Sequence, residues 1–183
     1  MITDPQSTKF ASAVKSHPSD STPQGKVERG ILERLSAEHP EWQLLDLSLA
    51  AAELGLSLVW QKAKPDAVWR IGPDELIVAE CYARVGALKS GHRRKLAMDA
   101  LKLMALRYQC PDAKRLKCLI IVPQEIQEQL KGKSWLCAAM NIAADLMPVV
   151  LSDDERELLA DTTRRQADGQ ARSRKPEKTR HPE

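Results

Sequence analysis

The order of periodic segments predicts an α/β protein with a mixed central sheet flanked by helices. Val27, Ile31 and Leu35 recur at helical spacing. Two β-type runs, 67–71 and 75–83, are separated by a Gly-Pro-Asp turn, which predicts an antiparallel hairpin. A helix, several strands, a helix, a strand and a further helix in this order are typical of a sheet covered by helices.

The first half of the chain contains two predicted helices and a predicted strand before the hairpin. The first helix ends at His39, because Pro40 restricts the residue before it. The apolar segment 41–55 predicts a second short helix that ends at a glycine. Residues 56–61, with the sequence LSLVWQ, predict the first of three consecutive strands.

The second half begins with a long charged helix and a buried strand. The run LKCLIIVP at 116–123 is continuously apolar and β-branched, which indicates a strand covered on both faces. The other predicted elements are helices at 91–108, 124–130 and 134–146 and a short strand at 149–151. Ser152 and Glu155 have the spacing of a capping box and predict a last helix that extends to Ala160.

The length of 183 residues is suited to one domain with two tails. Residues 1–23 are rich in Ser, Pro and Thr and predict a flexible leader. Residues 24–163 form the predicted single domain. Residues 164–183 have few apolar side chains and predict a basic disordered tail.

The cysteines and the absence of long apolar runs predict a cytoplasmic protein without membrane association. The four cysteines form no CxxC pair and have no histidine at zinc-finger spacing, so we expect buried thiols in a reducing compartment. The N-terminus lacks a basic segment followed by an apolar one, and no run of about 18 apolar residues occurs.

The positive charge is concentrated in two segments, although the net charge is only +3. Residues 84–102 carry six basic residues against one acidic residue, and 164–183 carry seven against three, so the rest of the chain has a net charge of −6. Such a distribution favours a polyanion, above all nucleic acid, as the partner. The alternative is a helix whose charges are simply solvated.

Pro65-Asp66 stands at the start of one predicted hairpin strand, and Glu80 stands near the end of the next. With this acidic pair, the segment from Lys64 to Leu106 resembles the PD-(D/E)xK nuclease superfamily, and within it a group of small bacterial proteins. The resemblance implies a restriction-endonuclease-like core with the order α-β-β-β-α-β. It also implies a divalent-metal-dependent nuclease acting on DNA, or less favourably on RNA, with a role in bacterial defence or DNA processing.

The resemblance implies a site for Mg²⁺ or Mn²⁺ at the end of the hairpin. Asp66, Glu80 and the main-chain carbonyl of Cys81 would be its ligands, and such oxygen ligands suit hard cations. The family's lysine should follow two residues after the glutamate, but Tyr82 occupies that position. A tyrosine, whose ordinary pKa is about 10, supplies no positive charge.

The helix at 91–108 offers replacements for the missing cation. His92, Lys95, Asp99 and Lys102 are separated by 3, 4 and 3 residues and therefore share one stripe of the helix. The neighbouring arc is apolar and is expected to pack on the sheet: Leu96, Ala100, Leu103 and Met104. The alternative role of the stripe is ion pairing within the helix, Lys95–Asp99 and Asp99–Lys102, on a solvated face.

We assign the following roles to the charged residues around the motif. Lys89 or Lys95 would stabilise the pentavalent phosphate, Lys95 being preferred because a helix fixes its position. His92 would position water or phosphate, and Glu28 could add a carboxylate, although a surface position is favoured for it. The expected nucleic-acid contacts are Arg84, Arg93, Arg94 and Lys102.

The missing strand lysine leaves a second hypothesis open. The chain could be a catalytically retired nuclease fold that binds nucleic acid or acts as an assembly subunit beside a partner enzyme. A protein partner or a homo-oligomer is compatible with both hypotheses.

Overall fold

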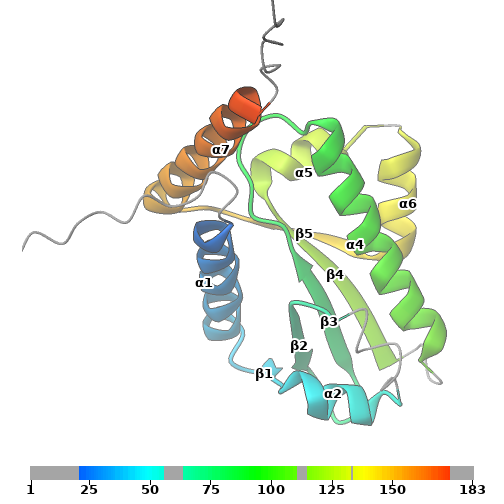
Figure 1. The fold of residues 1–183 in the computed structure, drawn as a ribbon. Coiled ribbons are helices and arrows are strands. Elements are labelled where there is room, and N and C mark those ends of the chain that lie inside the picture. The colour runs from blue at the N-terminus through cyan, green and yellow to red at the C-terminus, as the bar shows by residue number, and fades with distance from the viewer. Residues whose placement is uncertain (1–20, 56–63, 111–114, 133, 174–183) are drawn as a thin grey trace, which may run out of the picture.

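The computed structural model describes residues 21–55, 64–110, 115–132 and 134–173, and its centre is an open five-stranded sheet (Figure 1). The strands lie side by side in sequence order. The pairs β1–β2 and β2–β3 are antiparallel, whereas the pairs β3–β4 and β4–β5 are parallel. The strands are β1 (Gln43–Leu44), β2 (Ala67–Arg70), β3 (Leu76–Cys81), β4 (Leu116–Pro123) and β5 (Asp145–Val149).

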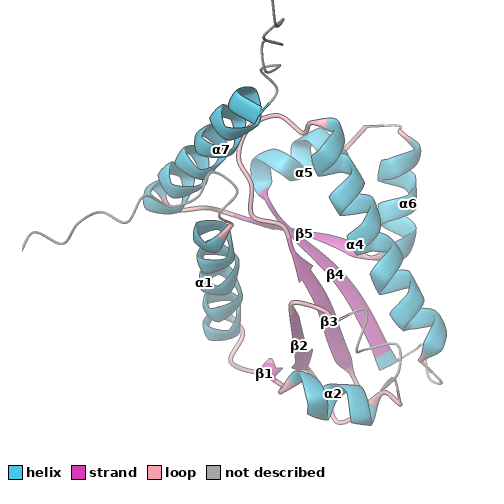
Figure 2. Cartoon of the chain, viewed as in Figure 1, coloured by secondary structure: helices cyan, strands magenta, loops and turns pink. Residues whose placement is uncertain are grey.

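Six helices flank this sheet in the described part of the chain (Figure 2). They are α1 (Thr22–Glu38), α2 (Leu47–Glu53), α4 (Ser90–Gln109), α5 (Gln124–Leu130), α6 (Trp135–Ala143) and α7 (Asp153–Ser173). Helices α1 and α7 lie on one side of the sheet, and α4 and α6 lie on the other (Figure 1). The predicted α/β architecture with a mixed sheet is therefore confirmed.

Strand β3 divides the hydrophobic interior into two cores. All six of its residues are buried. Because side chains alternate along a strand, Val78 packs toward α4 and α6, whereas Ile77 and Ala79 pack toward α1 and α7. Its neighbour β4 is buried on both faces only in its second half, because Lys117 is exposed and Leu119 is partly exposed, so the predicted burial on both faces holds for that half alone.

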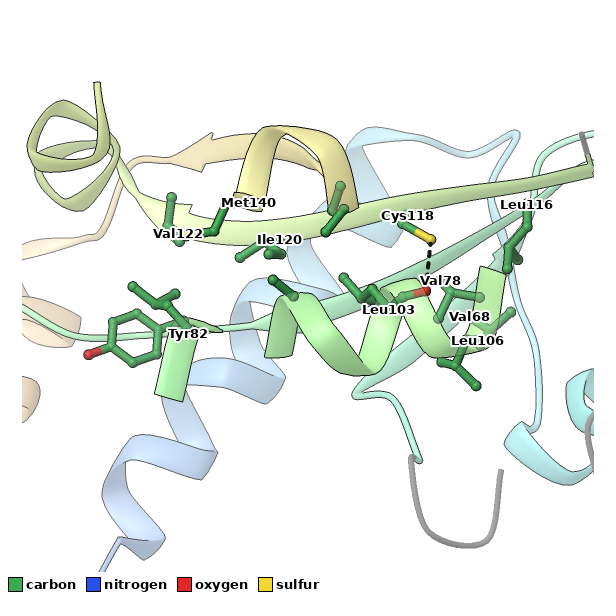
Figure 3. Packing of buried hydrophobic residues seen from close by; sticks show 14 of the residues in the cluster. Val68, Val78, Tyr82, Leu103, Leu106, Leu116, Cys118, Ile120, Val122 and Met140 are labelled. Atoms are coloured by element: carbon green, nitrogen blue, oxygen red, sulfur yellow. Dashed lines mark hydrogen bonds between the residues drawn. The ribbon is translucent and has the colours of Figure 1, made fainter. Parts of the chain in front are cut away.

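The core on the α4 side extends from Tyr82 to Leu106 and Leu116 (Figure 3). Along it the thiol of Cys118 donates to the main-chain carbonyl of Leu103 at 3.8 Å. All four cysteines are buried and free, as predicted. None of the helices in the described ranges combines the length and apolar character needed to cross a membrane.

Several predicted elements are confirmed at or near their predicted bounds. The hairpin forms between β2 and β3 with Val68 opposite Val78. Helix α4 covers the predicted 91–108 and one more residue at each end. The capping box at the start of α7 is present, because Ser152 N–H donates to Glu155 at 2.8 Å and Glu155 N–H donates to the Ser152 hydroxyl at 3.2 Å.

Other predicted elements are wrong in their extent. Residues 43–44 pair with β2 before the short helix begins, so 41–55 is not one helix. The predicted helix 134–146 ends at Ala143, because β5 begins at Asp145 rather than at the predicted residue 149. The strand predicted at 56–61 lies outside the described residues.

The end of the domain and one helix face also differ from the prediction. Helix α7 continues to Ser173, so residues 164–173 are helical rather than disordered, and the last helix does not end at Ala160. Helix α1 begins at Thr22, within the predicted leader. On α4, Leu96, Ala100 and Leu103 are buried as predicted, but Met104 is 40% exposed and does not join the core.

Candidate functional site

The hairpin places Asp66 directly beside the end of β3. Asp66 precedes β2, and its main-chain N–H donates to the Ala79 carbonyl at 3.0 Å. Its Oδ2 accepts the Cys81 N–H at 2.8 Å. The side chain is therefore held against the last residue of β3, while the residue as a whole remains exposed to solvent.

Glu80 is a buried carboxylate on β3, with its side chain 2% exposed. Its Oε2 lies 2.6 Å from the Lys102 ammonium of α4. Its Oε1 is one of two buried side-chain polar atoms that have no hydrogen-bond partner among the described residues. A buried carboxylate oxygen without a partner is uncommon, because desolvation of a charged group is costly.

The environment of Glu80 favours its protonated form. Burial, followed by the negative charge of Asp66, raises the pKa of Glu80 to about 8. The hydrogen bond and charge of Lys102 act in the opposite direction, and Asp99 adds a further raising effect. The repulsion between Asp66 and Glu80 indicates that the two carboxylates share one neighbourhood.

Glu28 of α1 brings a third carboxylate to the same end of β3. Its Oε1 accepts hydrogen bonds from the Gln24 amide at 2.7 Å and from the Ala83 N–H at 3.3 Å. Burial raises the pKa of Glu28; the two hydrogen bonds lower it, and the charge of Asp66 raises it. Glu28 is therefore partly buried rather than fully at the surface, and it borders the candidate site.

Lys95 of α4 is the cation that faces these carboxylates. Its ammonium pairs with Asp99 Oδ2 at 2.9 Å, as the local alternative for the helix stripe predicts. Burial acts to lower the pKa of Lys95, but the charges of Asp99, Glu28 and Asp66 outweigh it and the pKa is raised. The side chain is still 46% exposed, so its ammonium remains accessible from solvent.

Tyr82, which stands where the family has its lysine, packs in the core on the α4 side. Its residue is 1% exposed, and its hydroxyl is the second buried polar atom without a hydrogen-bond partner among the described residues. The Lys95 ammonium lies 5.5 Å from the centroid of the Tyr82 ring, a cation–π distance. Burial raises the pKa of Tyr82 to about 12, so the phenol stays neutral.

His92 and Lys89 lie at the beginning of α4. His92 Nδ1 accepts the Lys89 N–H at 3.4 Å, and its ring meets Tyr82 edge-on at 6.4 Å between centroids. Burial, followed by the charges of Arg84 and Lys89, lowers the pKa of His92, so the imidazole is neutral near pH 7. Lys89 is exposed at the N-cap of the helix.

The predicted nucleic-acid contacts fall into three settings. Lys102 is paired with Glu80 and also donates to the Lys64 carbonyl at 3.1 Å. Arg84 donates to Gln166 of α7 at 3.0 Å. Arg93 and Arg94 are exposed on the other flank of α4. The predicted basic residues therefore do not form one continuous surface around Glu80.

These residues form what we call the carboxylate–lysine cluster: Glu28, Asp66, Glu80, Lys95, Asp99 and Lys102. The sequence assigns Asp66, Glu80 and Lys95 to one site, and in the structure the charge of Asp66 acts on the pKa of Glu80 and on that of Lys95. The partnership of Lys102 with Glu80 was not predicted. The only signal for it was the position of Lys102 on the same helical stripe as Lys95.

The cluster offers carboxylate oxygen atoms as its only candidate side-chain ligands for a cation, and among the described residues they are few. In the described part of the chain, no three or more His, Cys, Asp and Glu side chains are grouped so that they could hold a metal ion. A site built here would rest on two carboxylates and main-chain oxygen, a set that suits Mg²⁺ or Mn²⁺ rather than zinc.

Comparison with models of protein families, with curated proteins and with solved structures yields no significant match to this chain.

Proposed function

We propose that this chain is a divalent-metal-dependent nuclease with a restriction-endonuclease-like core, which hydrolyses phosphodiester bonds in DNA or RNA. One observation carries the proposal: Glu80 has a buried, unpartnered oxygen and lies within electrostatic reach of Asp66 at the end of the hairpin. The negative charge of Asp66 contributes to the raised pKa of Glu80, and strongly shifted pKa values cluster at functional sites, so the arrangement favours a functional role.

The order of the elements supports the same fold family. Helix α1, the three strands β1, β2 and β3, helix α4 and strand β4 follow one another as α-β-β-β-α-β, with the short helix α2 inserted after β1. The hairpin of β2 and β3 carries the acidic pair, and α4 carries the basic stripe.

Asp66, Glu80 and the Cys81 carbonyl would hold Mg²⁺ or Mn²⁺. Within an extended strand the N–H and C=O of one residue point to the same side, and the Cys81 N–H points to Asp66. When bound, such an ion would lower the pKa of a water molecule and polarise the phosphate. Glu80 must first lose its proton and loosen its contact with Lys102.

Lys95 is the best replacement for the strand lysine. Its ammonium lies over the ring of Tyr82, the residue that occupies the position of the family's lysine. The ammonium is already held near Glu28 and Asp66. It would stabilise the negative charge that develops on the phosphate, whereas Lys102 compensates the charge of Glu80. Lys89, at the exposed N-cap, is the weaker candidate.

A cleavage assay tests the proposal directly. Plasmid DNA, single-stranded DNA and RNA are incubated with the purified protein and Mg²⁺ or Mn²⁺. We expect Glu80→Gln and Asp66→Asn each to lower cleavage by at least about 10³-fold. Glu75→Gln is the matched control, because Glu75 is a half-exposed carboxylate on the same hairpin. Cleavage that persists unchanged in Glu80→Gln would exclude this assignment.

A second candidate is a nucleic-acid-binding or assembly subunit without catalysis. The Glu80–Lys102 pair at 2.6 Å favours it, because this contact compensates the buried carboxylate without any metal. The neutral Tyr82 at the lysine position favours it as well. Calorimetry separates the two candidates: a binding subunit would take up nucleic acid with strong salt dependence but give no heat with Mn²⁺.

A further inference from the structure

A pocket of about 500 Å³ opens between the first turns of α4 and α6. Helix α4 lines it with Ser90, Arg93 and Arg94, and α6 and its N-cap line it with Ser134 and Trp135. We call it the Arg–Trp pocket. Residues two positions apart on a helix point about 160° apart, so Arg93 and Lys95 lie on nearly opposite flanks of α4.

The side chains of this pocket are available to a ligand. Arg93 and Arg94 are exposed, and neither guanidinium group makes an ion pair or a hydrogen bond with any residue that the structure describes. No acidic side chain lines the pocket. Trp135 is 77% exposed, although tryptophan is highly buried on average. Ala97 and the buried Leu136 supply an apolar wall.

This combination matches the chemistry of a nucleotide. A planar indole offers a stacking surface for a base of any identity, and arginine guanidinium groups bind phosphate oxygens through paired N–H donors. A base within a duplex is stacked on both faces and paired at its edge, so it cannot lie against Trp135 without being unstacked. The pocket therefore fits an unpaired nucleotide better than a duplex.

We propose that the Arg–Trp pocket binds one unpaired nucleotide, with its base stacked on Trp135 and its phosphate held by Arg93 and Arg94. The proposal rests on the proposed function in that nucleic acid is the ligand, and it narrows the substrate to strands that contain unpaired nucleotides. A strand anchored there would cross the first turn of α4 toward Lys95 and the acidic residues.

The test measures binding in the absence of divalent metal, so that cleavage does not interfere. Fluorescence anisotropy follows labelled oligothymidylate and oligouridylate of about 12 nucleotides, and the same lengths as blunt duplexes. We expect Trp135→Ala to weaken single-strand binding about tenfold, Trp135→Phe to retain most of the affinity, and duplex binding to change less than about twofold. The two oligonucleotides distinguish DNA from RNA.

Two exposed residues outside the pocket serve as matched controls. Tyr108→Ala removes an aromatic side chain that is 87% exposed near the C-terminal end of α4. Lys117→Ala removes one positive charge from β4, as Arg93→Ala does from the pocket. We expect the first to leave single-strand binding unchanged, and the second to weaken it less than Arg93→Ala does.

The outcomes separate this proposal from the nuclease assignment. Trp135-dependent binding without any cleavage would support the pocket and leave only the nuclease in doubt. If cleavage depends on Glu80 but Trp135→Ala leaves the affinity for oligonucleotides unchanged, the proposal for the pocket is wrong and the nuclease assignment stands. Sedimentation measures whether the protein forms an oligomer. If Trp135→Ala dissociates such an oligomer and leaves oligonucleotide binding intact, the pocket is a protein interface and the proposal is wrong.

Discussion

The two flanks of helix α4 use charge in opposite ways. On the flank toward β3, the ammonium groups of Lys95 and Lys102 are paired with Asp99 and Glu80 at 2.9 and 2.6 Å. On the flank toward α6, Arg93 makes no ion pair with a described residue. Buried charges must be compensated, and their pKa values shift in consequence. The two proposals accordingly assign chemistry to the first flank and attachment of nucleic acid to the second.

The largest effect is expected from Lys95→Ala, which removes the cation that we propose to stabilise the transition state. If Lys95 stabilises the transition state, cleavage should fall by about 10²–10³-fold while oligonucleotide affinity falls only about twofold. Arg93→Ala removes the same charge from the opposite flank. It should lower oligonucleotide affinity more than it lowers the rate of cleavage. Single-turnover cleavage and anisotropy on both variants measure the contrast. If Lys95→Ala and Arg93→Ala both have small and equal effects on cleavage, the result favours the binding-subunit hypothesis.

The next effect concerns stability and comes from Lys102→Met. Lys102 lowers the pKa of Glu80, so its removal raises that pKa beyond about 8. At about pH 6 Glu80 is protonated in the folded wild type and in the folded variant. Their free energies of unfolding should therefore agree within about 1 kcal/mol. At about pH 9, roughly one pH unit above the wild-type pKa of about 8, the variant should lose up to about 1.4 kcal/mol more stability than it does at about pH 6.

Chemical denaturation at the two pH values measures this difference. Arg94→Met is the control, because an exposed residue without a described partner should change stability by less than about 0.5 kcal/mol at either pH. If Lys102→Met costs the same at both pH values, the Glu80–Lys102 contact does not control the ionisation of Glu80.

A smaller, graded effect is expected from the titration of Glu80 itself. Its folded pKa of about 8 lies above the ordinary value of 4.5. Between these values the folded protein binds more protons than the unfolded chain, so the free energy of unfolding should fall as the pH rises, by about 1 kcal/mol per pH unit. Glu80→Gln should flatten most of this slope. A wild-type protein that gains stability from about pH 5 to 8 would contradict the raised pKa.

The sequence predicts the acidic flank because its geometry is local. The turn at residues 72–74 sets the hairpin, and the hairpin register then brings Asp66 to the end of β3. The helical spacing from Lys95 to Asp99 is likewise sufficient to predict their ion pair. The same spacing also suggests Asp99 as the partner of Lys102, but the buried Glu80, distant in sequence, takes that place.

The features that the sequence does not reveal depend on contacts between distant segments. Residues 164–173 have few apolar side chains, yet they continue α7, and within this stretch Gln166 accepts a hydrogen bond from Arg84 at 3.0 Å. Strand β1 has only two residues, both exposed, and exists because Leu44 pairs with Trp69. The exposure of Trp135 depends on how α6 packs against α4, and the periodicity of the sequence does not reveal that packing.

The smallest effect separates the two flanks by their response to salt. A cation that is already paired releases few counterions when nucleic acid binds, whereas a free guanidinium on a phosphate releases about one. Arg93→Ala and Arg94→Ala should each flatten the plot of log K against log salt by about one unit, and Lys102→Met should change the slope by much less. Anisotropy titrations between about 50 and 200 mM salt are sufficient to resolve this. Equal slope changes for Arg93→Ala and Lys102→Met would mean that nucleic acid displaces Lys102 from Glu80, and the distinction between a chemical and an attaching flank would then fail.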